Sequence, residues 1–196
     1  MTDSRKEARA ALRRRLKEAS AELMAAESAE ISRKLLSLGS LREARTILLY
    51  HSLPSEPSTA SLISALIAEG RTVALPVVKE DFSLELREYD SSRLRPAAMG
   101  LTEPDGTCRT IPPEEIDFAV IPGLGFDLEG HRLGRGKGCY DRLLPLLRPD
   151  CPKYGLAFSM QIMQKIPVEP HDAVLDGIIT IQDSFYCSDS APTALL

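Results

Sequence analysis

Apolar and polar residues alternate along the chain in patterns that predict strands and helices in turn. Ala8, Leu12 and Leu16 recur at helical spacing and predict an amphipathic helix from residue 4 to about residue 18. Apolar and β-branched runs predict buried strands, and the alternating run at 84–89 predicts a more exposed one. The predicted strands cover residues 45–51, 71–78, 84–89, 116–121, 154–158 and 175–181.

Helices are predicted between most of these strands, and capping residues mark several of their ends. Ser20 is expected to begin a second helix that runs to Leu38 and is ended by Gly39. Two prolines place a loop at 53–58, and the helix that follows it is expected to reach Ile67. Further helices are predicted at 140–147 and 160–165, with irregular connections at 91–115 and 122–138.

Strands that alternate with helices predict an α/β fold, in which a mainly parallel sheet has helices on both faces in a three-layer α/β/α arrangement. The chain shows no internal repeat or linker, so we expect a single domain over residues 1–185 and a flexible tail, rich in Ser, Asp and Thr, at 186–196. In such sheets ligands bind beyond the carboxyl ends of the strands. The expected positions are those after Tyr50, Pro76, Ile121 and Phe158.

Composition narrows the class of protein. The net charge of −4 over 196 residues argues against a general affinity for nucleic acid, which needs a basic surface. No apolar run approaches the roughly 20 residues of a membrane helix. The four cysteines show no C-x-x-C spacing and are expected to be free thiols in a reducing compartment. We therefore expect a cytoplasmic protein that binds small molecules, with neither nucleic acid nor membrane as a partner. No predicted helix carries a spare apolar face, so we also expect a monomer.

Positive charge is nonetheless concentrated in two places, the first predicted helix and one later loop. The basic residues are Arg5, Lys6, Arg9, Arg13, Arg14, Arg15 and Lys17 in the helix, and Arg132, Arg135 and Lys137 in the loop. Two cationic clusters on an acidic protein suit a small polyanion. The helix cluster also has a simpler interpretation, as a solvated helix face.

The loop at 132–140 carries the most specific chemistry, because glycines alternate with cations directly before a predicted helix. These residues are Gly134, Arg135, Gly136, Lys137 and Gly138. Glycines permit positive φ and let backbone N–H groups approach an oxyanion. The cations form charge-assisted hydrogen bonds with phosphate oxygens. The loop therefore predicts a phosphate-binding site.

A carboxylate follows the loop. Asp141 falls in the first turn of the predicted helix, where it is placed to hold a Mg²⁺ ion that bridges phosphates. The segment is not a P-loop, because G-x-x-x-x-G-K-[ST] is absent, and the G-x-G-x-x-G pattern fails at Cys139. The alternative is a glycine-rich surface loop with solvated cations, in which Asp141 only complements the helix N-terminus. The preceding strand, the interleaved cations and the carboxylate together favour phosphate binding.

Residues 122–141 resemble the signature of the 5-formyltetrahydrofolate cyclo-ligase family, also called methenyltetrahydrofolate synthetase. That signature is similar to P-G-(L)-(A/G)-F-D-x-x-G-x-R-L-G-x-G-x-G-Y-Y-D. The chain follows it with one departure, Cys139, where the family usually has the first of two tyrosines. The resemblance extends to the basic first helix, to the strand and loop at 50–59, and to Asp176, so it covers most of the chain.

This resemblance implies an ATP- and Mg²⁺-dependent ring closure, in which 5-formyltetrahydrofolate becomes 5,10-methenyltetrahydrofolate and ADP and phosphate are released. The implied ATP-binding residues are Arg5, Lys6, Arg9, Arg132, Leu133, Gly134, Arg135, Gly136, Lys137, Gly138, Cys139 and Tyr140. The implied folate-binding residues are His51, Glu56, Arg135, Gly136, Lys137, Gly138 and Cys139, with Glu56 accepting hydrogen bonds from the pterin ring. Arg135 and Lys137 are implied as catalytic cations, and Asp141 and Asp176 as Mg²⁺ ligands.

Other interpretations stay open at this level. A catalytically idle relative would keep the fold and bind nucleotide, with Cys139 as a sign of decay, although the retained cations and carboxylates argue against it. A phosphotransferase acting on another small substrate would have no obvious use for Glu56. Individual residues also have structural alternatives: Glu56 as an exposed loop acid, His51 as a satisfied strand-end histidine, and Asp176 as a turn residue before Gly177.

Overall fold

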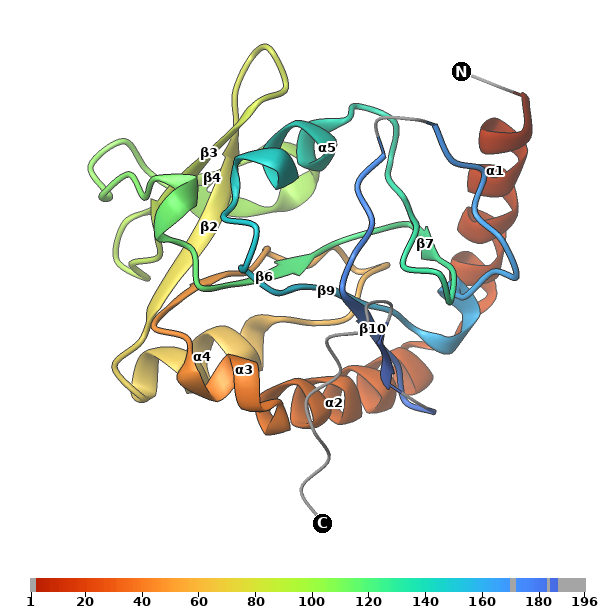
Figure 1. Ribbon diagram of the computed structural model, residues 1–196, viewed down its shortest axis with the longest axis horizontal. Helices are drawn as coiled ribbons and strands as arrows, with labels where there is room; N and C mark the ends of the chain where they lie inside the picture. The colour runs from red at the N-terminus through yellow and green to blue at the C-terminus, as the bar shows by residue number, and fades with distance from the viewer. Residues whose placement is uncertain (1–2, 170–171, 183, 187–196) are drawn as a thin grey trace.

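A seven-stranded sheet forms the centre of the protein (Figure 1). The computed structural model describes residues 3–169, 172–182 and 184–186. The strand order is β11-β10-β9-β6-β1-β2-β3, with β3 and β11 antiparallel to their neighbours at the two edges and all other pairs parallel. The strands are β1 (Thr46–Leu48), β2 (Thr72–Val78), β3 (Leu84–Glu88), β6 (Phe118–Ile121), β9 (Lys153–Leu156), β10 (Gly177–Ile179) and β11 (Ser184–Tyr186). The predicted α/β fold with a mainly parallel sheet is confirmed.

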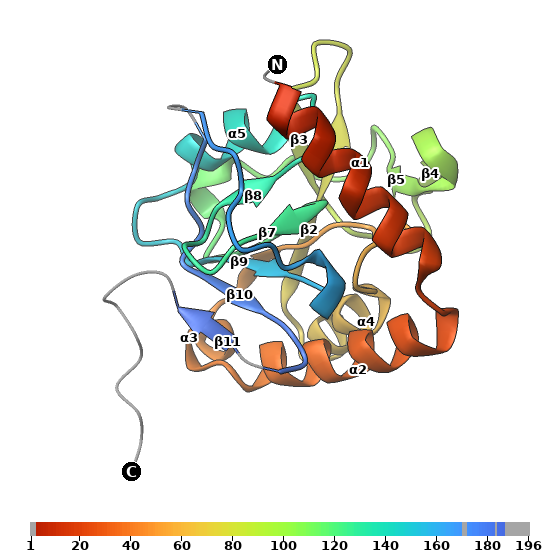
Figure 2. The same cartoon turned by 90° about the vertical axis from the view of Figure 1, so that its right-hand side faces the viewer.

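Helices lie on both faces of this sheet, as Figures 1 and 2 show. Helices α2, α3 and α4 cover one face, the short α5 lies over the other, and α1 crosses one end of the molecule. Their bounds are α1 (Asp3–Glu18), α2 (Ala21–Ser37), α3 (Gly39–Glu43), α4 (Ala60–Ala68) and α5 (Cys139–Leu143). Ser20 caps α2 as predicted, since its side chain accepts a hydrogen bond from Leu23 N.

The alternation of side chains along each strand explains why one apolar core lies on each face of the sheet. Successive strand side chains point to opposite faces of a sheet. Ile47 therefore joins the apolar cluster formed with α1 to α4, and its neighbour Leu48 joins a second cluster with Phe126 and Leu143. Both β1 side chains are fully buried. A central strand covered on both faces reads as a continuous apolar run, which is why the sequence predicted it.

The segments expected to be irregular contain two small hairpins. Strands β4 (Leu94–Pro96) and β5 (Thr102–Pro104) pair in one, and β7 (Gly125–Phe126) and β8 (Arg132–Leu133) pair in the other. The prediction of irregular connections was wrong at these places. Strands of two or three residues are too short for the sequence to show an alternation of apolar and polar residues.

Three predicted element ends are also wrong. Gly39 does not end α2 but begins α3, because Leu38 already turns the chain in an extended conformation. The helix predicted at 140–147 stops at Leu143 and continues as a 3₁₀ turn that contains Pro145, a residue without an N–H to donate. The helix predicted at 160–165 is only the 3₁₀ turn η4 (Ser159–Gln161).

The end of the described chain also differs from the expectation. The tail was expected to begin at residue 186, but Tyr186 is the last residue of β11, which pairs with β10. Residues 187–196, which make up nearly all of the predicted tail, lie outside the described residues. Among the helices of the described residues, none is both long and apolar enough to cross a membrane.

The topology brings two distant loops together. Strand β1 pairs with β2 on one side and with β6 on the other, so the strand order reverses between β1 and β6. Such a switch point leaves a crevice beyond the carboxyl ends of the strands, where α/β proteins bind ligands. The loops that leave these two ends are residues 49–59 and 122–138.

Candidate anion-binding site

Helix α1 has an apolar contact with β7 and a polar contact with the glycine-rich loop. Leu12 lies so close to Gly125 that a Cβ added there would be 2.5 Å from Leu12 Cδ1. One turn earlier, Arg9 donates a hydrogen bond from Nε to Gly134 O over 2.8 Å. The Arg9 side chain also lies beside Gly136, with Cζ 3.7 Å from the position of a Cβ there. The basic helix and the basic loop are therefore parts of one site.

Arg132 and Asp141 form a buried ion pair beneath the loop. Arg132 Nη2 donates to Asp141 Oδ1, and their side chains are only 4% and 17% exposed. Gly134 leaves room for this guanidinium, since a Cβ there would meet Arg132 Nη1 at 2.9 Å. Arg132 also lies 5.8 Å from the centre of the Tyr140 ring. This pair fixes the start of α5 relative to β8.

The backbone of the loop needs its glycines at two positions. Gly136 and Gly138 have φ of 109° and 66°, values that L side chains rarely adopt. Helix α5, which follows, has only five residues. The helix dipole expected from the sequence is therefore weak here, and side-chain cations must supply most of the positive potential.

Arg135 joins this loop to the loop that follows β1. Its Nη2 donates to Glu56 Oε1 over 2.9 Å and to Ser55 Oγ over 3.0 Å. Glu56 is not an exposed loop acid, since its side chain is 7% exposed and its Oε2 accepts a hydrogen bond from Leu53 N. The switch point thus places the carboxylate implied to bind folate beside a cation implied to bind phosphate.

Arg5 brings in two acids that the sequence did not single out. Its Nη1 lies 2.9 Å from Asp172 Oδ2 and 3.2 Å from Glu169 Oε2. Arg5 and Asp172 side chains are 7% and 5% exposed. Asp172 is 167 positions away in the sequence, and a lone acid in a loop gives no local signal of this contact.

The cations of α1 crowd one another. The pKa of Arg9 is lowered, first by burial and then by the positive charges of Arg5 and Arg13, against an opposite effect of Glu169 and Asp172. A bound anion would relieve this repulsion. Burial likewise raises the pKa of Tyr140, and the charge of Glu56 raises it further, so its hydroxyl stays protonated and available as a donor.

Lys137 extends from the loop toward the tip of the β2–β3 hairpin. Its Nζ lies 4.4 Å from the centre of the Phe82 ring. Cys139 is the first residue of α5 and is partly buried. Leu133 has its side chain in the apolar core, so only its backbone is available to a ligand.

Three of the implied site residues are not brought into this cluster. Lys6 is exposed on α1. His51 Nδ1 donates to Thr102 O over 2.6 Å, in the β4–β5 hairpin. Asp176 precedes β10 at the amino edge of the sheet, where its Oδ2 accepts a hydrogen bond from Lys153 N over 2.7 Å. The glycine-rich loop belongs to the connection that leaves the opposite, carboxyl end of β6.

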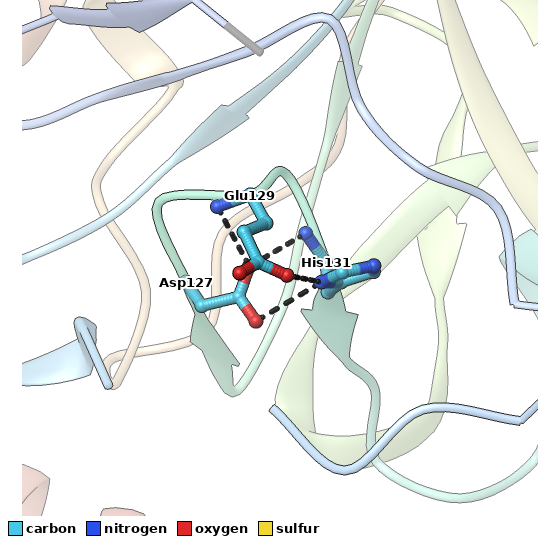
Figure 3. Close-up of side chains that lie close together, drawn as sticks. All are labelled: Asp127, Glu129 and His131. Carbon is cyan, nitrogen blue, oxygen red and sulfur yellow. Dashed lines mark hydrogen bonds and ion pairs between the residues drawn. The ribbon is translucent and has the colours of Figure 1, made fainter. Parts of the chain in front are cut away.

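A second group of acids and a histidine has a structural role (Figure 3). Asp127, Glu129 and His131 place one possible metal-ligand atom each within 4.8 Å of one another. Asp127 is fully buried, and Oδ1 accepts from the N–H groups of Glu129 and His131. Its Oδ2 contacts His131 Nδ1 and accepts from Ile166 N. These contacts occupy both oxygens and shape the β7–β8 turn.

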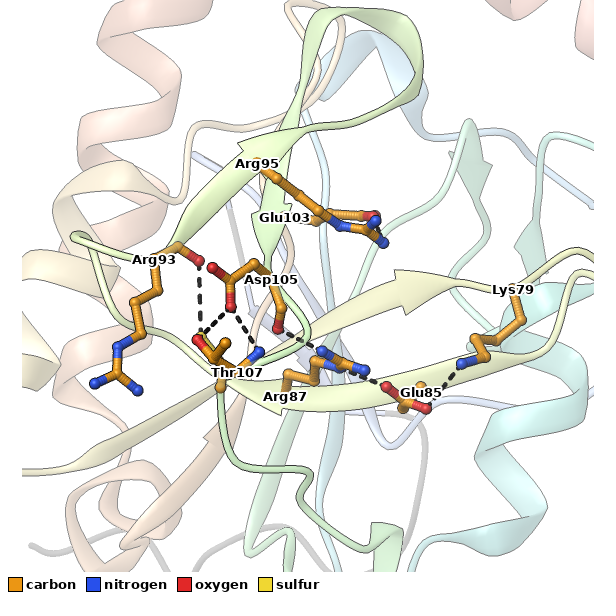
Figure 4. A network of polar contacts seen from close by, with 9 residues as sticks. Lys79, Glu85, Arg87, Arg93, Arg95, Glu103, Asp105 and Thr107 are labelled. Carbon is orange, nitrogen blue, oxygen red and sulfur yellow. Dashed lines mark hydrogen bonds and ion pairs between the residues drawn. The ribbon is translucent and has the colours of Figure 1, made fainter.

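The polar network around the β4–β5 hairpin is also structural (Figure 4). Arg95 pairs with Glu103 over 2.6 Å across the hairpin, and Arg87 pairs with Glu85 on β3. Hollows of about 500 and 600 Å³ flank this region, and none of the loop cations lines them. These ion pairs fix the hairpin, and the cations of the glycine-rich loop take no part in them.

The fold and the site together define an α/β protein that concentrates cations and a glycine-rich loop at the switch point of a mainly parallel sheet. The sequence matches the 5-formyltetrahydrofolate cyclo-ligase family over residues 1–181. The chain belongs to this family of enzymes.

Individual relatives agree with this assignment. A 5-formyltetrahydrofolate cyclo-ligase of Mycolicibacterium smegmatis is 33% identical over 69% of this chain and 73% of its own. One from Haemophilus influenzae is 32% identical over 76% of this chain and 82% of its own. The NMR structure of Aquifex aeolicus 5,10-methenyltetrahydrofolate synthetase superposes with a TM-score of 0.84 at 29% identity, covering 97% of this chain and 96% of that one.

Proposed function

We propose that this chain catalyses the ATP- and Mg²⁺-dependent cyclisation of 5-formyltetrahydrofolate to 5,10-methenyltetrahydrofolate, with release of ADP and phosphate. The observation that carries the proposal is the contact between Arg135 and Glu56. It puts a cation suited to phosphate directly beside a carboxylate suited to the amino-pyrimidinone edge of a pterin. A phosphotransferase for another small substrate would need the first group but not the second.

The reaction asks the protein mainly to position two substrates and to stabilise phosphate charge. The formyl oxygen attacks the γ-phosphorus of ATP, and ADP leaves. The anilino nitrogen then closes on the formyl carbon, after which its proton and phosphate depart. Every covalent step uses groups of the substrates themselves, so no protein nucleophile is required.

The roles proposed for the cations follow from their places around the loop. Arg9 and Arg132 are buried and fixed, so they suit the binding of phosphates that do not react. Arg135 is more exposed and contacts Glu56, and Lys137 extends toward Phe82 of the β2–β3 hairpin, so these two suit the transferred phosphoryl group. A preorganised set of cations stabilises the transition state because it needs no rearrangement as charge develops.

Carboxylates at the edge of the cationic cluster fit Mg²⁺, which binds in nucleotide sites through one or two carboxylates together with phosphates. When bound, the ion neutralises charge on the phosphate oxygens. Asp141 is suited to hold it, and Asp172, the more deeply buried of the two acids that contact Arg5, is suited to be a second ligand. Asp176 does not fit, because it lies at the other edge of the sheet. We therefore propose Asp172 in its place.

The decisive experiment mixes purified protein with 5-formyltetrahydrofolate and MgATP and follows the ultraviolet absorbance of the methenyl product. Product is expected together with an equal amount of ADP, and neither should form without ATP. Bound ATP without product would instead support a catalytically idle relative.

We propose the cytoplasm as the place of this reaction and a monomer as the active form, although the relative from Arabidopsis thaliana carries the description mitochondrial.

A further inference from the structure

The tip of the β2–β3 hairpin, residues 79–83, combines two features that a purely structural turn would avoid. Phe82 has a φ of 63°, in the left-handed region where an aromatic residue is a genuine outlier. Its side chain is also 41% exposed, although it is large and apolar. A glycine at this position would remove both features without changing the turn.

The strained conformation is fixed by the turn itself. Lys79 N donates to Ser83 O over 2.9 Å, and Phe82 N donates to Lys79 O over the same distance. The side chain of Asp81 accepts hydrogen bonds from both the N–H and the hydroxyl of Ser83. Strained residues that neighbouring hydrogen bonds hold in place gather at functional sites. The strain and the exposure of Phe82 therefore indicate a function for its ring.

That ring contacts a cation of the phosphate loop. Lys137 Nζ lies 4.4 Å from its centroid, within the range of a cation–π interaction. Arg132 and Arg135 of the same loop are paired with carboxylates. Lys137 has no such partner within the described part of the chain, where no carboxylate oxygen lies within 4.0 Å of its Nζ. An aromatic face orients an ammonium group without cancelling its charge, so the full positive charge stays available to an anion.

A second contact ties the same residue to the helix that follows the loop. Arg142 on α5 donates from Nη2 to Phe82 O over 2.6 Å. Arg142 Nη1 also lies 3.3 Å from where a Cβ of Gly138 would be. The hairpin tip is thus joined to both ends of the segment that connects Lys137 to α5.

We propose that Phe82 is a positioning residue, which holds the ammonium group of Lys137 over the phosphate loop, ready for the transferred phosphoryl group of ATP. The proposal rests on the function proposed above, in which Lys137 binds phosphate. The β2–β3 hairpin accordingly forms a third wall of the site, beside α1 and the loop after β1. Phe82 itself does not touch the reacting atoms.

Phe82→Gly separates this role from a structural one. Glycine accepts the positive φ, so the thermal unfolding midpoint should stay the same or rise. The loss of the ring should lower kcat/KM for MgATP by about two- to fivefold, the strength of one partly exposed cation–π contact. Phe82→Tyr keeps the aromatic face and should retain wild-type kinetics, while Phe82→Leu keeps only apolar bulk and should share the defect.

A double-mutant cycle tests whether the effect acts through Lys137. In a Lys137→Gln background, Phe82→Gly should cause no further loss. An equal loss in both backgrounds, or unchanged kinetics in Phe82→Gly, would overturn the proposal. If the wild-type protein makes no methenyl product, the proposed function fails instead. The cycle is then measured as the affinity for a fluorescent ATP analogue, and the same pattern of losses is expected if Phe82 positions Lys137.

Discussion

Arg135 Nη2 lies 2.9 Å from Glu56 Oε1, although 79 positions separate the two residues in the chain. The contact joins the loop after β1 to the loop after β6, on either side of the switch point. The other oxygen of Glu56, Oε2, accepts a hydrogen bond from Leu53 N and keeps a further lone pair for a ligand. The pair therefore holds the two proposed substrate-binding loops at a fixed spacing.

Glu56→Gln should raise the KM for 5-formyltetrahydrofolate by about tenfold or more, because a hydrogen bond to a charged group contributes about 1.5–3 kcal/mol. The KM for ATP should change much less. Steady-state kinetics with each substrate varied in turn makes the comparison. Glu114→Gln, at an exposed acid away from the site, is the matched control and should leave both constants unchanged. Equal effects on both substrates would contradict the assignment of Glu56 to the pterin.

Asp141→Ala should abolish turnover and also destabilise the protein. The change leaves Arg132 buried and unpaired, which costs about 3–5 kcal/mol in such pairs. A fall in the unfolding midpoint therefore does not argue against a role in Mg²⁺ binding. Asp141→Asn keeps a hydrogen-bond acceptor and separates the two effects. It should raise the Mg²⁺ concentration needed for half-maximal activity, and an unchanged Mg²⁺ dependence would remove Asp141 from the metal site.

Gly136→Ala should impair ATP binding through the backbone alone. The nearest side-chain atom to an added Cβ is Arg9 Cζ at 3.7 Å, so there is room, but a φ of 109° is strained for alanine by about 1–3 kcal/mol. We expect a KM for ATP raised by about tenfold, measured at saturating folate. Gly39→Ala is the control, because nothing lies within 4 Å of its added Cβ and its φ is not positive. Wild-type kinetics in Gly136→Ala would show that the loop adopts another conformation when ATP binds.

Asp117, just before β6, should stabilise the packing of β6 beside β1, and this stabilisation should depend on pH. Burial acts to raise its pKa, but hydrogen bonds from Thr46 N, Arg45 N and Arg148 lower it below the ordinary value. A lowered pKa in the folded state stabilises the protein above the unfolded value of about 3.9, and this contribution is lost as the pH falls through the folded pKa.

Asp117→Ala should therefore reduce the free energy of unfolding at neutral pH by about 1–3 kcal/mol. The difference from wild type should shrink below a pH of about 4. Denaturant unfolding across the acid range measures both. Asp150→Ala removes the other, far more exposed carboxylate partner of Arg148 and should change stability by less than about 1 kcal/mol. A difference that grows on acidification would contradict a lowered pKa for Asp117 in the folded protein.

Cys139 should be the thiol that reports ATP binding. Cys108 and Cys151 are 7% and 1% exposed, and burial raises the pKa of Cys151 to about 11, whereas Cys139 is only partly buried. In a Cys187→Ser background, which removes a thiol outside the described residues, iodoacetamide at neutral pH should label Cys139 first. Saturating MgATP should slow this labelling. An unchanged rate would mean that the loop does not close around the nucleotide.

Prediction from sequence succeeded where the signal is local. The buried run at Thr46–Leu48, the N-cap at Ser20 and the glycine-rich loop each occupy a short segment whose composition reflects its own surroundings. The small hairpins escaped prediction because their strands are too short to show a period. The site roles of Lys6, His51 and Asp176 were implied by the resemblance, and the structure does not bring these three residues to the contacts around Arg9, Arg132 and Arg135.

The sequence by itself determined the mainly parallel α/β fold, the glycine-rich loop and the family, because periodicity, turn residues and motif spacing are properties of contiguous residues. Only the tertiary structure decided which acid accompanies which cation: Glu56 with Arg135, Asp172 with Arg5. The same holds for Phe82 and Lys137. The two residues of each pair are far apart in the chain, and the arrangement of the strands in the sheet decides which of them meet. The local sequence around each residue therefore does not reveal its partner.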